Sequence, residues 1–389
     1  MPTSLTTAPP RLRLEFLDGL RGLAALYVVL FHAYQGITFD DTHVNPSLIW
    51  RIGHPAVSVF IVLSGFCLML PVVRSGTGNL RGGAHEYFAR RAWRILPPYY
   101  AALVLSIVFL VIAHLARYRS GLALHDNVLK MQLSVSSLLS HLFLVHNFSR
   151  EWIETIDVPM WSVATEWQIY FFLPALLLPI WRRFGGWPML AAGFGVGLLP
   201  HYLLPAASNF DWACPWYLGL FTTGMGGAVL AFSPSQLAWR DRLPWGSLAG
   251  ALFILLFALV VFVPNTIISA YVWQTDALAG AATICLILMC TKLAVDTSCS
   301  RPFILRVLED RRTLGIGAFS YSLYLVHYPI LNKFALLLAM SQFSLLEKLI
   351  IIYVVGVPFA LILSYLFYLA FEKKFVVRSS QPQPVTVLK

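Results

Sequence analysis

The chain has 389 residues, of which 58% are hydrophobic and 12% are charged, and its mean hydropathy is +0.71. A soluble domain carries roughly 25% charged residues, so this composition excludes a soluble enzyme and indicates a polytopic membrane protein. The net charge of +10 comes from short basic clusters between apolar runs, which is typical of membrane topology. We therefore expect membrane lipid, and no nucleic acid, around the chain.

Ten apolar runs are each long enough to cross a bilayer as a helix. They lie near 20–37, 55–73, 95–116, 160–181, 187–204, 211–232, 245–264, 270–291, 315–339 and 345–370. With the N-terminus inside, 21 of the 28 Lys and Arg residues fall on the cytoplasmic side and 7 outside. The positive-inside rule then predicts that both termini are cytoplasmic. The sequence predicts an all-α bundle of about ten transmembrane helices at 17–371, with an N-terminal arm at 1–16 and a C-terminal tail at 372–389.

The first run places an arginine near its start and a histidine near its end. Arg21 and His32 are eleven positions apart, close to three helical turns, so both lie on one face and roughly 16 Å apart along the axis. Asp18 falls on nearly the same face. Arg21 could simply mark the cytoplasmic end of the span, with His32 as a hydrogen-bonded packing residue. Because ionisable groups inside a span are costly, the aligned pair favours a functional role.

The loop at 74–94 concentrates arginines at the cytoplasmic edge of the third run. If a helix begins near Glu86, Arg90 or Arg91 shares a face with Arg94. Guanidinium groups that converge at an interface suit a polyanionic phosphate ligand, although arginines also serve as topology signals alone. Just upstream, Ser64 and Gly65 lie inside the second run, where small residues indicate close helix packing.

The longest external stretch, 117–159, is large enough to form a recognition surface. Within it, 133–147 is too short and too polar for a span, and we expect an interfacial or re-entrant segment. Glu166 follows at a depth of roughly 9 Å from the outside, close to the depth of His32. The two could form a base and the group that orients it. Alternatively, Glu166 caps the external end of its helix.

The rest of the chain adds fewer candidates. Residues 185–300 resemble bundle scaffold, and 292–313 form a second basic patch on the cytoplasmic side. The stretch SYSLYLVHYPIL puts Tyr321, Tyr324 and His327 or Tyr328 along one helical stripe, where buried aromatic residues are also expected. The five cysteines have no metal-ligand spacing, so no metal is predicted.

Five motifs, in this order, resemble the acyltransferase-3 family of integral membrane O-acyltransferases. They are LDGLRG with Arg21 and His32, FIVLSGF around Ser64, RRAWRILPPYY, WSVATEWQIYFFLP and SYSLYLVHYPI. The resemblance covers most of the chain. One motif alone would be a weak signal, but five in the family's order are a strong one.

The resemblance implies a multi-pass protein of the cell (inner) membrane that transfers an acyl group, commonly acetyl, from cytoplasmic acyl-CoA to a hydroxyl of an extracytoplasmic acceptor. It implies that His32 is the essential histidine with Arg21 as its partner, and that Arg90, Arg91 and Arg94 hold the acyl-CoA. The last run ends in Phe371, Glu372, Lys373 and Lys374 where many relatives have Glu-Arg-Pro. This departure leaves Glu372 without an assigned role.

Several alternatives remain open at this point. Neutral His32 could take a proton from the acceptor hydroxyl, with Glu166 fixing its tautomer, and a covalent acyl-histidine is equally compatible. The acceptor could be a polysaccharide, a lipid-linked sugar or a macrolide-like small molecule. The competing class is a proton-coupled transporter of an anionic or sugar substrate, with His32, Glu166 and His327 as a proton relay. Against it, the two halves of the chain lack paired interrupted segments.

Overall fold

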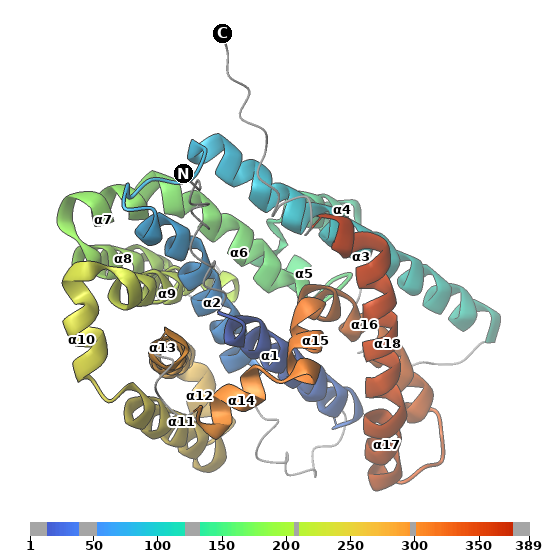
Figure 1. Ribbon diagram of the computed structural model, residues 1–389. Helices are drawn as coiled ribbons and strands as arrows, with labels where there is room; N and C mark the ends of the chain where they lie inside the picture. Colours follow the sequence, from blue (N-terminus) through green and yellow to red (C-terminus); the bar gives the residue numbers. More distant parts are fainter. Residues whose placement is uncertain (1–13, 39–52, 121–132, 206–209, 296–300, 376–389) are drawn as a thin grey trace, which may run out of the picture.

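The computed structural model describes residues 14–38, 53–120, 133–205, 210–295 and 301–375, and every regular element in these ranges is helical (Figure 1). The longer helices are α1 (Phe16–Thr38), α2 (His54–Arg74), α3 (Gly83–Ser120), α6 (Met160–Phe172), α8 (Gly186–Leu203), α9 (Tyr217–Phe232), α11 (Trp245–Phe262), α13 (Val272–Val295), α16 (Ser320–Ala339) and α18 (Val357–Phe367). The shorter ones are α4 (Val135–Leu142), α5 (Arg150–Ile153), α7 (Leu178–Phe184), α10 (Leu237–Arg242), α12 (Asn265–Ala270), α14 (Phe303–Leu308), α15 (Arg311–Ala318) and α17 (Leu345–Ile351). π-helical turns at Leu173–Leu177, Ile352–Gly356 and Tyr368–Glu372 continue α6, α17 and α18.

Eight helical segments of the described residues are long and apolar enough to cross a membrane. They are Phe16–Thr38, His54–Arg74, Gly83–Ile112, Met160–Phe184, Trp245–Phe262, Val272–Val295, Ser320–Ala339 and Leu345–Phe375. The other two expected runs correspond to α8 and α9, of 18 and 16 residues, which are not among the eight. The all-α polytopic bundle is confirmed, whereas the number ten stays a prediction. The sides of the two termini also stay predictions, since 1–13 and 376–389 lie outside the described residues.

The ends of the bundle differ slightly from the expected domain limits. Leu14 and Phe16 are already buried against other helices, inside the stretch assigned to the N-terminal arm. The last helical segment continues to Phe375, and Glu372 is buried, so the C-terminal tail starts later than residue 372. In 133–147, α4 has eight residues, or roughly 12 Å of helix, which is too short to span. Part of the stretch that we expect on the external side, 121–132, lies outside the described residues.

Helix α1 lies at the centre of the bundle and packs against α2, α14, α15 and α16 (Figure 1). The glycines of LDGLRG make this packing possible, because they let backbones approach closely. A Cβ on Gly19 would lie 1.8 Å from the carbonyl oxygen of Leu308, and one on Gly22 would lie 2.8 Å from that of Thr313. The motif therefore seats α14 and α15 against the start of α1.

Helix α2 packs against α9 over a large part of its length. Here a Cβ on Gly65 would lie 2.0 Å from the carbonyl oxygen of Phe221, so the expected close packing beside Ser64 is confirmed. Large apolar side chains on the outer helices remain exposed, including Val104, Ile254, Phe262 and Val354. Such a surface is suited to lipid, and it leaves the polar groups of α1, α2, α3, α6 and α16 facing the interior.

Candidate active site

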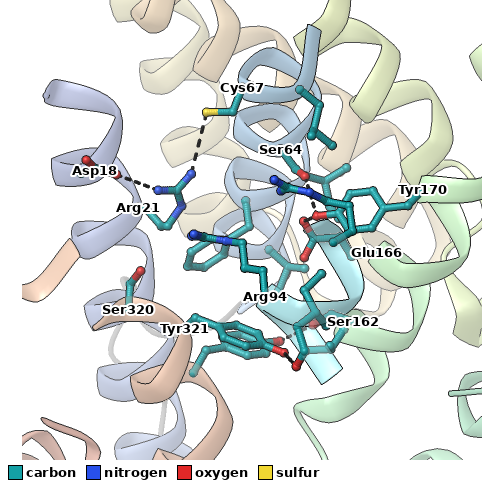
Figure 2. A pocket seen from close by; sticks show the side chains of 18 residues that line it. Asp18, Arg21, Ser64, Cys67, Arg94, Ser162, Glu166, Tyr170, Ser320 and Tyr321 are labelled. Atoms are coloured by element: carbon teal, nitrogen blue, oxygen red, sulfur yellow. Dashed lines mark hydrogen bonds and ion pairs between the residues drawn. The ribbon is translucent and has the colours of Figure 1, made fainter. Parts of the chain in front are cut away.

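A cavity of about 340 Å³ lies inside the bundle between α1, α2, α3, α6 and α16 (Figure 2). Its lining on α2 runs from Val57 to Leu68, which is roughly 16 Å along the helix axis and about half of a ~30 Å hydrocarbon core. The polar side chains in the lining are Asp18, Arg21, Ser64, Cys67, Arg91, Arg94, Ser162, Glu166, Tyr170, Ser320, Tyr321 and Tyr324. A long, narrow ligand with a charged end fits this shape better than a compact one.

Three arginines line the cavity, Arg21 from α1 and Arg91 and Arg94 from α3. Arg21 donates to Asp18 Oδ1 at 2.8 Å and reaches Cys67 Sγ at 3.8 Å. Within the described ranges, neither a hydrogen bond nor an ion pair holds the guanidinium of Arg91 or Arg94. Figure 2 shows Arg21 and Arg94 pointing into the same space from two helices. The arrangement suits an anion, because a guanidinium donates to phosphate or carboxylate through two N–H groups at once.

Arg90 does not join this group. Its guanidinium donates to Glu86 Oε2 at 3.0 Å and to the carbonyl oxygen of Arg81 at 2.6 Å, outside the cavity. Neighbouring residues on an α-helix point about 100° apart, so one face of α3 presents Arg91 and Arg94 but not Arg90. The sequence left open whether Arg90 or Arg91 shares a helix face with Arg94, and in the structure it is Arg91.

Glu166 faces the cavity and belongs to a chain of hydroxyl groups. Tyr170, one turn further along α6, donates its hydroxyl to Glu166 Oε1 at 2.5 Å. The Tyr170 oxygen also lies 2.9 Å from Ser64 Oγ on α2. The three residues come from two helices that are distant in sequence, and all three line the cavity beside the arginines (Figure 2). Glu166 is therefore a cavity residue, and its hydrogen-bond partner in the described ranges is Tyr170.

His32 lies outside the cavity lining and pairs with a second histidine. His32 Nδ1 is 2.9 Å from His327 Nε2, and His327 Nδ1 is 2.9 Å from the carbonyl oxygen of Leu323 one turn earlier on α16. Aromatic rings of Phe31 and Tyr328 flank His32. His327 is fully buried, whereas His32 is partly exposed. The buried partner is thus held by its own helix and in turn holds His32.

The expected pairing of His32 with Glu166 is wrong. Among the described residues, the hydrogen bond of His32 is to His327 and that of Glu166 is to Tyr170. Similar depth in the membrane did not bring them together, because depth follows from position along each helix, whereas contact also depends on how each helix is rotated. Rotation turns His32 towards α16 and Glu166 into the cavity.

Tyr324 connects the two parts of the site. Its hydroxyl lines the cavity and lies 2.6 Å from Ser162 Oγ on α6. One turn further along α16, the ring of His327 lies 5.9 Å from the Tyr324 ring, measured between centroids. The expected stripe of polar tips on α16 is therefore real, and it leads from the cavity to the histidine pair.

The segment before α6 holds a different cluster of titratable groups. The rings of His141 and His146 stack face to face, with centroids 3.8 Å apart and planes inclined by 7°. Burial lowers the pKa of His141 to about 4 and also lowers that of His146, where the neighbouring His141 adds to the effect. Asp157 is fully buried with Ser106 donating to its Oδ2, and burial raises its pKa to about 8.

At the other end of the chain, Glu372 accepts hydrogen bonds from the backbone N–H and the hydroxyl of Ser322, at 3.0 and 2.5 Å. The carboxylate thus ties the last helical segment to the start of α16. In the described ranges, no group of three or more His, Cys, Asp or Glu side chains could hold a metal ion. Cys67, Cys214, Cys285 and Cys290 are free thiols, and Cys299 lies outside the described residues.

Sequence reasoning identified five residues at or near this site but missed how three others participate. The sequence alone indicates a packing role for Ser64 and no role for Tyr170, and it places His327 on the aromatic stripe or, in the competing transporter, in a proton relay. The hydrogen-bonded partners are 106 and 295 positions apart in the chain, and no local spacing rule reaches that far. One signal was available for Ser64, since a hydroxyl inside an apolar span needs a hydrogen-bond partner.

Comparison with known proteins gives matches over most of the chain. The acyltransferase-3 family model, described as an acyltransferase domain, matches residues 14–369. The peptidoglycan O-acetyltransferase OatA of Listeria monocytogenes is 25% identical over 87% of this chain and 52% of its own length. The putative membrane-bound transacylase BcsY of Komagataeibacter xylinus is 26% identical over 82% of this chain and 73% of its own length.

A third relative is the acyltransferase MdmB of Streptomyces mycarofaciens, 31% identical over 45% of this chain and 41% of its own length. The chain thus spans about half the length of the Listeria relative and less than half of the Streptomyces one. No solved structure matches the chain.

Proposed function

Because the chain belongs to the acyltransferase-3 family, we propose that it is a membrane O-acyltransferase that moves an acyl group, acetyl in the simplest case, from acyl-CoA to a hydroxyl of an acceptor across the membrane. The observation that carries this proposal is the arginine-lined cavity. It extends roughly half the thickness of a bilayer and ends at Tyr324, whose ring lies beside the His32–His327 pair.

Arg91 and Arg94 hold the phosphates of the donor in this proposal, and Arg21 positions the part of the donor that lies deeper. Their guanidiniums come from two helices and line one cavity. Arg90, which lies outside the cavity and is paired with Glu86, acts as a rim charge that attracts the anionic donor from a distance. The slender pantetheine arm matches the elongated shape, and the cavity lining along α2 gives it a path towards the opposite side.

His32 acts as the general base through its Nε2 atom. The carbonyl oxygen of Leu323 can only accept, so His327 carries its proton on Nδ1, and neutral His327 then accepts at Nε2. His32 must therefore donate from Nδ1, which leaves the lone pair of its Nε2 atom free. That nitrogen takes the proton of the acceptor hydroxyl as the oxygen attacks the acyl carbon.

The acceptor is a hydroxylated compound on the extracytoplasmic side, in the class of polysaccharides, lipid-linked sugars and macrolide-like molecules. The name of the Listeria relative, a peptidoglycan O-acetyltransferase, supports a carbohydrate hydroxyl. The host membrane is the cell (inner) membrane, where cytoplasmic acyl-CoA and an external acceptor are both in reach.

Transfer of labelled acetyl groups tests the proposal. Purified protein in liposomes is incubated with radiolabelled acetyl-CoA and a panel of hydroxylated acceptors, and we expect an acetylated product. A labelled sugar enclosed in parallel liposomes tests the transporter. Flux of that sugar with no acetylated product from any acceptor would overturn the enzyme and support a carrier.

The arginines provide a matched set of variants for the donor site. Arg91→Ala and Arg94→Ala should each weaken acetyl-CoA binding by roughly one to two decades, because a charge-assisted contact contributes about 1.5 to 3 kcal/mol. Lys at either position should restore only part of the affinity, since it lacks the planar fork. Arg90→Ala, outside the cavity, should cost less than threefold at physiological salt. Equal losses at all three positions would mean that only the summed charge matters.

A further inference from the structure

Ser64 differs from the other two serines that line the cavity in where its hydroxyl points. Ser162 and Ser320 each donate to a carbonyl oxygen three residues earlier in the chain, the usual solution for a serine in an apolar helix. Ser64, on α2, instead makes its hydrogen bond across the cavity wall to Tyr170 on α6. The Ser64 hydroxyl therefore bonds to a side chain on another helix and not to the backbone of its own helix.

The direction of that hydrogen bond follows from the next link. Tyr170 donates the single proton of its hydroxyl to Glu166 Oε1. The Tyr170 oxygen then has only lone pairs to offer, and Ser64 must be the donor in the 2.9 Å contact. The proton of Ser64 thus lies on a path that ends at a carboxylate.

The surroundings of Ser64 suit a group that gains negative charge. Cys67, three positions further along α2 and on the same face, is in contact with the Arg21 guanidinium at 3.8 Å. Ser64, Cys67 and Arg21 all line the cavity (Figure 2). A guanidinium within about one helical turn of a hydroxyl can stabilise an oxyanion that forms beside it, and the low dielectric of the interior strengthens the effect.

We propose that Ser64 is a nucleophile that carries the acyl group as a covalent acyl-serine intermediate, with Tyr170 and Glu166 as its proton path. The inference rests on the proposed acyl transfer and specifies its first half. The Ser64 oxygen bonds to the carbonyl carbon of the acyl-CoA thioester and the bond from that carbon to sulfur breaks. The hydroxyl proton passes through Tyr170 to Glu166 and then to the departing thiolate, which leaves as coenzyme A.

The second half takes place at the same serine, because the acyl group is covalently bound there. The acceptor oxygen attacks the acyl carbon on Ser64, and the proton of the acceptor hydroxyl replaces the acyl group on the Ser64 oxygen as its ester bond breaks. Loading is favourable, because a thioester lies above an oxygen ester in free energy, and transfer from one ester to another is nearly balanced.

The intermediate can be trapped in the absence of acceptor. The full chain in liposomes is incubated with radiolabelled acetyl-CoA, denatured and digested, and the peptides are identified by mass spectrometry. We expect one acetyl group on Ser64, stable at neutral pH and released by acceptor, together with ping-pong kinetics. Acyl-imidazole on His32 would hydrolyse quickly at neutral pH, so a labile label that disappears in His32→Ala would overturn the serine assignment.

Variants separate the nucleophile from its proton path. Ser64→Ala should lose the label and lower transfer by at least ~10²-fold, whereas Ser64→Cys should keep a label, now as a thioester. Tyr170→Phe should slow loading and leave the peptide assignment unchanged. Ser58→Ala is the matched control, because Ser58 lies on the same helix outside the cavity lining and donates to Asp276. It should load as wild type does.

The outcomes distinguish this inference from the function on which it rests. Product formation by wild type without any covalent label, or full transfer by folded Ser64→Ala, would overturn the acyl-serine and leave direct transfer to the acceptor. Neither label nor product from wild type, with acetyl-CoA bound, would overturn the transferase itself.

Discussion

The described part of the chain contains two histidine pairs that are built in opposite ways. His32 and His327 meet edge to edge, with a nitrogen-to-nitrogen distance of 2.9 Å, and their neighbours orient every proton. His141 and His146 meet face to face at 3.8 Å, and in the described residues no hydrogen bond reaches His146 or the Nε2 atom of His141. The first pair joins α1 to α16, and the second lies within the segment that precedes α6.

The two geometries differ in what they can do with a proton. An edge-to-edge contact needs one donor and one acceptor, so it defines the tautomers and leaves one basic nitrogen free. A face-to-face stack shares no proton, and burial favours the neutral form of both rings. The first pair is therefore suited to chemistry, and the second is suited to hold the segment before α6 together at neutral pH.

Removal of the free base should have the largest effect. His32→Ala should lower acyl transfer by at least ~10²-fold, the low end of what general-base catalysis contributes, and leave acetyl-CoA binding nearly intact. Wild-type activity should rise with pH as the imidazole becomes neutral, because only that form accepts a proton. Labelled product and bound acetyl-CoA are measured in the same samples. Full transfer by folded His32→Ala would show that the two pairs do not differ in catalytic role.

Substitutions of His327 test whether its hydrogen bond orients His32. His327→Phe removes the acceptor for His32 Nδ1 and should lower kcat about fivefold, since one hydrogen bond is worth about 1 kcal/mol, with KM for acetyl-CoA unchanged. His327→Gln places an amide oxygen near the position of Nε2 and should recover most of the activity. If the kcat of His327→Gln is as low as that of His327→Phe, His327 does not act by accepting the hydrogen bond of His32.

Asp157, in the same segment as the stacked pair, should make the stability of the protein depend on pH. Its pKa is 3.8 when unperturbed and about 8 in the folded protein, so the folded state binds a proton more tightly and stability falls as pH rises from 3.8 towards 8. Asp157→Asn should raise the free energy of unfolding at pH 8 by about 1 to 3 kcal/mol, the cost of a buried unpaired polar group. Thermal unfolding at pH 5 and pH 8 measures it. A variant with the wild-type pH dependence would contradict the assignment.

The stacked pair His141–His146 should change the stability with pH in the opposite direction, and by a smaller amount. Burial lowers the pKa of His141 from 6.5 to about 4, so the unfolded chain protonates first and stability falls as pH drops from 6.5 towards 4. His146→Phe keeps a stacked ring and removes one titrating group. It should flatten this acid limb, change the free energy of unfolding at pH 7 by less than about 1 kcal/mol, and leave transfer unchanged. Loss of transfer would mean that this pair also belongs to the site.

Much of the fold follows from the sequence, because helix formation in a membrane is a local property. An apolar run of the right length satisfies its own backbone hydrogen bonds, so eight spans could be located without knowing their neighbours. Arg21 and Asp18 share one face of α1, and Arg91 and Arg94 share one face of α3. Both relations are local, since the two residues of each pair are three positions apart on the same helix. The family motifs added the expected chemistry and named His32.

Only the tertiary structure decided which residues meet across helices. Sequence placed His32 and Glu166 at one depth, but the rotation and packing of α1, α2, α6 and α16 paired His32 with His327 and brought Ser64 to Tyr170. The bond between Tyr170 and Glu166 is local, because the two lie one turn apart on α6. Those rotations depend on contacts such as the close approach of Gly65 to the Phe221 backbone. A periodic pattern reports the face of a residue on its own helix, whereas the neighbour of that face is set by the simultaneous packing of all the helices.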